Sequence, residues 1–95
     1  MNGRTCLITG ATDGIGKETA KQMAKNGYNL ILIGRNEEKG KKVSDEIRKI
    51  ADSIDIDFFK ADLMLMKEVS RVADEVCQKY DQIDVLINNV GAYFA

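Results

Sequence analysis

The amino-acid sequence predicts an α/β protein with a parallel sheet and the element order β-α-β-α-β-α-β. Three observations lead to this class. Short apolar runs of strand length alternate with longer amphipathic stretches, and no proline interrupts either kind. A turn that contains Gly10, Gly14 and Gly16 joins the first apolar run to the first amphipathic stretch.

The first half of the chain supplies two strands and two helices. Residues 5–9 and 29–33 are the apolar runs, and a helix between them begins near Ile15 and ends at Asn26-Gly27. Asn36 is expected to cap the second helix. The expected inward positions are Ile15, Thr19, Ala20, Met23 and Ala24 in the first helix, and Val43, Ile47, Ile50 and Ala51 in the second.

The second half repeats the alternation. Residues 54–60 form a weaker strand in which acidic and apolar residues alternate, as expected at a sheet edge, residues 67–80 form a helix, and residues 83–87 form the last strand. The third helix is expected to turn Val69, Val72, Ala73 and Val76 inward. Acid–lysine pairs four residues apart indicate a solvated face on the second helix: Glu37/Lys41, Glu38/Lys42 and Asp45/Lys49.

Handedness fixes the layout of these elements. Right-handed crossovers, with strand four returning beside strand one, give the strand order 3-2-1-4 and place the first two helices on one face and the third on the other. Ligands bind at such a switch point in open α/β sheets. We therefore expect the loops at residues 10–16 and 88–91 to line one crevice.

Composition limits the classes of function. The chain has 95 residues, 31% of them charged, with a net charge of −1, which indicates one globular domain without the basic field that nucleic acid binding needs. No apolar run has the length of a membrane span or a signal peptide, so a cytoplasmic protein is expected. Cys6 and Cys77 are expected to be reduced and buried. The chain has no histidine, and no residues show metal-ligand spacing, so no metal is assigned.

The glycine turn suits a bound phosphate. Residues without side chains let the backbone approach a phosphate closely, and the following helix directs its free N–H groups and the positive end of its dipole toward it. Thr12 and Asp13 add short side chains that can bond within the loop or to a ribose. The alternative is a turn that serves tight packing only.

The spacing Thr9-Gly10-x-x-x-Gly14-x-Gly16 resembles the cofactor loop of the short-chain dehydrogenase/reductase family. Asn88-Asn89-Val90-Gly91 resembles that family's N-N-A-G motif, and Asp62-Leu63 its acidic-aliphatic pair beside adenine. The run from Gly14 to Gly40 is similar to the retinol-dehydrogenase-like branch. The resemblance implies that residues 1–95 are the N-terminal, dinucleotide-binding part of a Rossmann domain, a doubly wound parallel sheet.

The resemblance also implies roles for individual residues. The region around the pyrophosphate would be contacted by Gly10, Gly14, Ile15 and Gly16. Asp62 would bond the adenine amino group, Leu63 would flank the ring, and Asn88 would lie along the adenosine ribose, with Gly91 closing the same motif. In the alternative readings Asp62 only caps or turns the chain, and the Asn pair only forms a turn.

Arg35 bears on the choice of cofactor. By the resemblance, Gly34 stands where members that prefer NAD carry an acid, and Arg35 follows it. A guanidinium group suits a phosphate dianion, so the sequence predicts NADP(H), against the alternative of an ordinary surface arginine.

The family's catalytic tyrosine, with a lysine four positions later, has no counterpart among these residues. Two functions therefore compete: an NADP(H)-dependent oxidoreductase represented by its cofactor-binding part, and a truncated, non-catalytic dinucleotide-binding or interaction module. A methyltransferase half that binds S-adenosylmethionine fits the glycine spacing poorly. Strand four is expected to present an uncovered edge that favours self-association, and the chain by itself is expected to be inactive.

Overall fold

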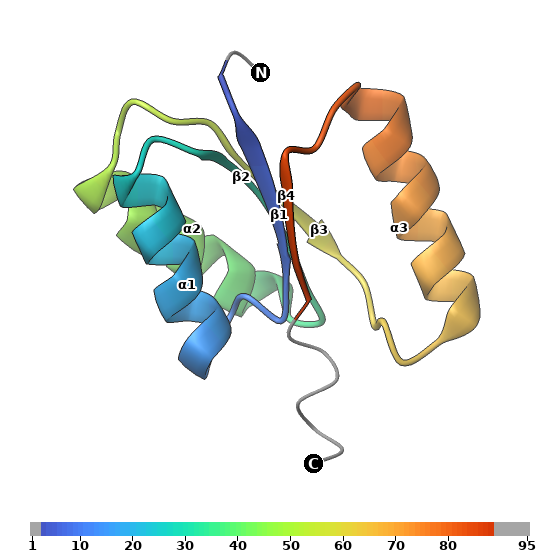
Figure 1. Cartoon of the computed structure of the whole chain (residues 1–95). Coiled ribbons are helices and arrows are strands. Elements are labelled where there is room, and N and C mark those ends of the chain that lie inside the picture. Colours follow the sequence, from blue (N-terminus) through green and yellow to red (C-terminus); the bar gives the residue numbers. More distant parts are fainter. Residues whose placement is uncertain (1–2, 89–95) are drawn as a thin grey trace.

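The computed structural model describes residues 3–88 and contains alternating strands and helices (Figure 1). The elements are β1 (Thr5–Thr9), α1 (Gly14–Lys25), β2 (Asn29–Gly34), α2 (Glu37–Ile50), β3 (Ile56–Lys60), α3 (Met66–Lys79) and β4 (Val85–Asn88).

The four strands form one parallel sheet in the order β3-β2-β1-β4, as the sequence predicts. In the register, Cys6 of β1 lies opposite Leu30 of β2 on one side and Val85 of β4 on the other, and Leu30 pairs in turn with Ile56 of β3. The central strands β1 and β2 are buried along their whole length, which is why their middle residues are apolar, while the polar residues Thr5, Thr9 and Asn29 stand at strand ends.

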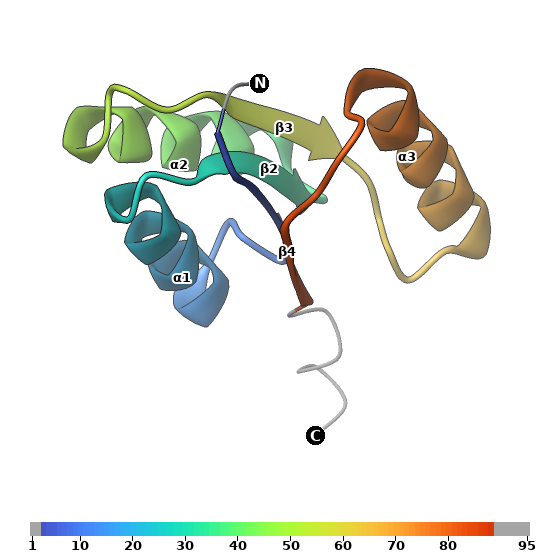
Figure 2. The same cartoon turned by 45° about the horizontal axis from the view of Figure 1, so that its top comes forward.

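The helices form two layers, with α1 and α2 on one face of the sheet and α3 on the other (Figures 1 and 2). Each layer has its own core. Under α1 and α2 lie Cys6, Ile8, Ala11, Ala20, Ala24, Leu30, Leu32, Val43 and Ile47. Under α3 lie Leu7, Ile31, Ile33, Ala61, Val72 and Val76. The prediction of one helix layer on each face is confirmed.

The inward face of α1 differs from the expectation. Ile15 is 80% exposed, whereas the buried positions are Gly16, Ala20 and Ala24. A Cβ atom on Gly16 would lie 2.0 Å from the carbonyl oxygen of Gly10, so the helix approaches the preceding loop too closely for any larger residue. This approach fixes the rotation of the helix and turns Ile15 outward.

Three further positions predicted to face inward are exposed: Ile50, Ala73 and Cys77. Ala73 and Cys77 each follow a buried valine of α3 by one residue, about 100° around the helix, which carries them out of the contact. Ile50 is the last residue of α2 and is 46% exposed.

The other cysteine, Cys6, is buried as predicted. Burial raises the pKa of its thiol to about 11.

The last strand begins at Val85 rather than at residue 83. Asp84 stands just before it, and its carboxylate accepts a hydrogen bond of 2.8 Å from the Thr5 backbone N–H. The Asp84 N–H donates in return to the Thr5 carbonyl at 2.9 Å. This exchange fixes the start of β4 against β1.

The surface of α2 is partly as predicted. Asn36 caps the helix, because its side-chain oxygen accepts a hydrogen bond from the Lys39 N–H at 3.1 Å. The ion pairs are different from those expected: Glu46 lies 3.0 Å from Lys17 and 3.5 Å from Lys21 of α1, and so joins the two helices of this layer.

Candidate cofactor-binding site

The glycine turn after β1 has a backbone reason for each of its glycines. Gly10 and Gly14 have φ angles of +63° and +55°, in the left-handed region that favours glycine. Gly16 is required by its closeness to Gly10, whose own N–H donates to the Ile33 carbonyl at 3.0 Å. The alternative that the glycines serve tight packing therefore applies to Gly10 and Gly16. At Gly14 a Cβ atom would meet nothing within 4 Å, so this side of the turn is open.

The backbone N–H groups at the N-terminus of α1 have no side-chain cap. Asp13 occupies the N-cap position, but its carboxylate caps none of the helix N–H groups, and the first turn contains no acidic residue. Within residues 3–88, no acceptor lies on the N–H groups of Gly14, Ile15 and Gly16. These groups can therefore receive an anion, with the helix dipole favouring it.

A cavity of about 970 Å³ lies beside this turn, over the carboxyl ends of β1, β2 and β3. Of the residues predicted to bind the cofactor, those that line it are Gly10, Thr12, Asp13, Arg35, Asp62 and Leu63. Gly14, Ile15, Gly16 and Asn88 do not line it. The cavity therefore extends from the glycine turn toward β3 and away from β4.

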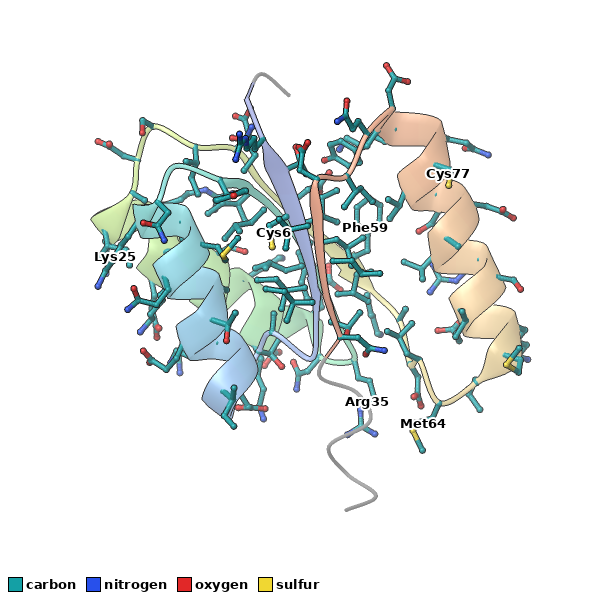
Figure 3. The ribbon with its side chains drawn as sticks, in the orientation of Figure 1. Cys6, Lys25, Arg35, Phe59, Met64 and Cys77 are labelled. Carbon is teal, nitrogen blue, oxygen red and sulfur yellow. The ribbon has the colours of Figure 1, made fainter. Side chains whose placement is uncertain are left out.

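Arg35 lies at the mouth of this cavity, just after β2. Its side chain is exposed, and within the described residues it makes no hydrogen bond or ion pair. Figure 3 shows Arg35 and Met64 at the same end of the sheet, where the strands end. The preceding Gly34 is buried, and a Cβ atom there would lie 3.0 Å from the Thr12 methyl carbon and 3.4 Å from the Phe58 ring.

Sequence reasoning missed two cations of the cavity, Lys39 and Lys60. The Lys39 ammonium group lies 3.1 Å from the Asp13 carboxylate, across 26 positions of sequence. The signal that could have found Lys39 is its place in the first turn of α2, beside the carboxyl end of β2. The whole lining carries these cations and Arg35, together with the carboxylates of Asp13, Glu37, Glu38 and Asp62.

Asp62 turns the chain after β3. Its Oδ1 atom accepts a hydrogen bond of 3.0 Å from the Met64 N–H, and its carbonyl accepts one of 3.1 Å from the Leu65 N–H. The reading of Asp62 as a turn residue is thus confirmed, while its contact with adenine stays a prediction. Leu63 beside it is half-buried and supplies an apolar wall.

Asn88 ends β4 next to the glycine turn. It pairs with Thr9 in the sheet, and its Oδ1 atom accepts a hydrogen bond of 2.8 Å from the Thr9 hydroxyl. Asn88 thus lies beside Thr9, the residue before the glycine turn, 79 positions away in sequence. It does not line the cavity, so the expectation that both loops line one crevice is not met for Asn88. Asn89 and Gly91 lie outside the described residues.

The model of the short chain dehydrogenase family matches residues 4–94. The chain belongs to this family. Human retinol dehydrogenase 13 is 35% identical over 94% of the chain, and the very-long-chain 3-oxoacyl-CoA reductase of Vanderwaltozyma polyspora is 45% identical over 95%. The short-chain dehydrogenase from Sphingobium yanoikuyae in complex with NADPH has a TM-score of 0.81 and 29% identity, and covers 92% of the chain. Together with the observed topology, these similarities confirm the Rossmann-type fold.

This family member spans only part of the length of its relatives. The matched segments are 27% of retinol dehydrogenase 13, 26% of the reductase and 34% of the Sphingobium chain. Within residues 3–88, no group of three His, Cys, Asp or Glu side chains could hold a metal ion. None of the described helices is both long and apolar enough to cross a membrane.

Proposed function

We propose that this chain binds NADP(H) and supplies the cofactor-binding, N-terminal part of an oxidoreductase of the short-chain dehydrogenase type. The observation that carries the proposal is the cavity between the glycine turn and the start of α2, lined by the Arg35 guanidinium group, which has no hydrogen-bond or ion-pair partner among residues 3–88. When bound, the nicotinamide ring of such a cofactor accepts or donates a hydride.

The residues present suit the parts of a dinucleotide. The free N–H groups at the start of α1 would hold the diphosphate. Leu63 would lie against the adenine, with the remaining carboxylate oxygen of Asp62 as the acceptor for its amino group. Asn88, at the end of β4, would lie along the adenosine ribose, and Gly91 would follow in the same loop.

The steric surroundings of Gly34 support NADP(H) over NAD(H). An acid that bonds the 2′-hydroxyl of NAD is expected at this position, but the Thr12 methyl group occupies the space beside it. Arg35, one residue on, can instead form a two-pronged contact with a 2′-phosphate. Because the lining also carries carboxylates, the preference depends on this local contact and not on a basic field.

The test is a titration of the chain with NADPH and with NADH, followed by the fluorescence of the reduced nicotinamide ring. Arg35→Ala removes a charge-assisted contact of about 1.5–3 kcal/mol, so NADPH should bind roughly 10-fold to 150-fold more weakly. NADH binding should change little.

Arg48→Ala is the matched control, because Arg48 is an exposed arginine of α2 that pairs with Asp45 at 3.4 Å and does not line the cavity. The assignment of NADP(H) is wrong if Arg35→Ala leaves the preference for NADPH intact. The whole proposal is wrong if neither dinucleotide binds.

A non-catalytic dinucleotide-binding module is the second candidate. Neither Tyr28 nor Tyr80 is followed by a lysine four positions later, but because the chain spans only part of the length of its relatives, this does not decide between the two candidates. The two candidates differ in what the gene encodes: an open reading frame that continues with a Tyr-x-x-x-Lys motif supports the oxidoreductase, and a protein that binds NADPH but is never extended by such a motif supports the module.

A further inference from the structure

The ion pair between Asp13 and Lys39 joins the two walls of the cavity. Asp13 belongs to the glycine turn, Lys39 to the first turn of α2, and both side chains line the cavity that Arg35 borders. The carboxylate–ammonium distance is 3.1 Å. The pair therefore lies where an anionic group of a ligand would enter between the turn and the helix.

Two observations show that this pair contributes little to the fold. The side chains of Lys39 and Asp13 are 52% and 69% exposed, and an ion pair so open to solvent is weak. Asp13 also stands at the N-cap of α1, where an aspartate ordinarily accepts hydrogen bonds from the helix, yet it makes no such bond. Its carboxylate is directed toward the cavity cation instead.

The backbone of Lys39 is held in place by hydrogen bonds, whereas its side chain is half-exposed and is held only by the ion pair with Asp13. The Lys39 N–H donates to the Asn36 side chain, and the next residue, Gly40, donates its N–H to the Asn36 carbonyl at 3.0 Å. A Cβ atom on Gly40 would lie 2.5 Å from the Phe58 ring, so α2 is packed tightly against β3 at this point. Only the flexible lysine side chain needs to move for the ion pair to open.

We infer that Asp13 and Lys39 are an opposed pair that sets the affinity for the phosphate monoester of the cofactor. Lys39 leaves Asp13 and becomes a second cation for the phosphate beside Arg35, while the Asp13 carboxylate repels the same phosphate. This inference rests on the proposed binding of NADP(H). A phosphate monoester carries close to two negative charges at neutral pH, so it competes effectively with a single exposed carboxylate for the ammonium group.

The test uses the full chain and the variants Asp13→Asn, Lys39→Gln and the double variant, each titrated with NADPH and with NADH. Lys42→Gln is the matched control, because Lys42 is an exposed lysine of the same helix that does not line the cavity. Circular dichroism melts verify that each variant folds.

Lys39→Gln should weaken NADPH binding about tenfold. Asp13→Asn should tighten it by about twofold to fivefold, the range expected of an exposed charge pair. NADH binding should change little in both variants. Removal of Lys39 should also cost more in the Asp13→Asn background, because the lysine no longer has to leave its partner.

A merely structural tie gives a different pattern: both single variants would weaken NADPH and NADH equally, and that result overturns the inference. So does tighter NADPH binding in Lys39→Gln. These failures differ from failure of the proposed function, since in them the unsubstituted chain still binds NADPH and still depends on Arg35. If the chain binds neither dinucleotide, both proposals fall together.

Discussion

The contact between Gly40 and Phe58 sets the distance between α2 and β3, and it can be tested by adding one carbon atom. In Gly40→Ala the new Cβ would lie 2.5 Å from two ring carbons of Phe58 and 2.7 Å from a third. Because carbon atoms pack best at about 3.5–4.0 Å, the ring or the helix must move by about 1 Å. Overpacking of this kind costs about 1–3 kcal/mol, whereas alanine in a helix gains up to about 1 kcal/mol over glycine.

We therefore expect Gly40→Ala to lower the free energy of unfolding by about 1 kcal/mol, and so the melting temperature by roughly 4–8 °C. The measurement is urea unfolding followed by far-ultraviolet circular dichroism, with the exposed Lys42→Ala as a helix-surface control. In the background of Phe58→Leu the ring is gone, so the same Gly40→Ala change should become stabilising. The reasoning is refuted if the effect of Gly40→Ala has the same sign and size in both backgrounds.

Three further outcomes are expected. Partial burial raises the pKa of Asp57, but hydrogen bonds from Lys79 and Tyr80 outweigh it and hold that pKa below its usual 3.8, while burial and Asp57 raise the pKa of Tyr80 above 10. The hydrogen bonds to the Asp57 carboxylate should therefore stabilise the fold at neutral pH, and this stabilisation should be lost in acid below about pH 3.8. In Asp57→Asn, the free energy of unfolding should accordingly fall less steeply as the pH is lowered through this range. Asn36→Ala removes the cap of α2 and should cost about 1 kcal/mol in urea unfolding, with recovery in Asn36→Ser. Leu86 is 67% exposed on the edge strand β4, so sedimentation should show self-association that Leu86→Lys reduces, and a chain that is monomeric at all concentrations would contradict this.

The sheet could be predicted almost completely from the sequence, because its causes are local. Apolar runs such as residues 29–33 identify strands, and the handedness of crossovers then leaves one strand order. The helix faces were harder to predict. A periodic stripe does not decide between neighbours about 100° apart, so it predicts Ile15 and Cys77 to be buried although both are exposed. The close packing of Gly16 on Gly10 turns Ile15 outward.

The candidate site was predicted where a short motif carries it and missed where distant segments build it. The glycine turn and Asp62-Leu63 follow strands directly, so their place at the carboxyl edge of the sheet could be inferred from the sequence. Lys39 reaches Asp13 across 26 positions, and this depends on how α2 lies against β3, which no local pattern encodes.

The two layers on the sheet are held unequally, and this has a consequence for local opening. On one face of the sheet, α1 and α2 share one large core and are joined by the ion pairs of Glu46 with Lys17 and Lys21. On the opposite face, α3 is the only one of the described helices, and it packs on the sheet through Val72 and Val76. Amide hydrogens of β2, buried along its whole length, should exchange with solvent only on global unfolding, and those of α3 should exchange through a smaller, sub-global opening. A molecule with this gradient can release α3 from its face of the sheet while α1 and α2 stay packed on the opposite face.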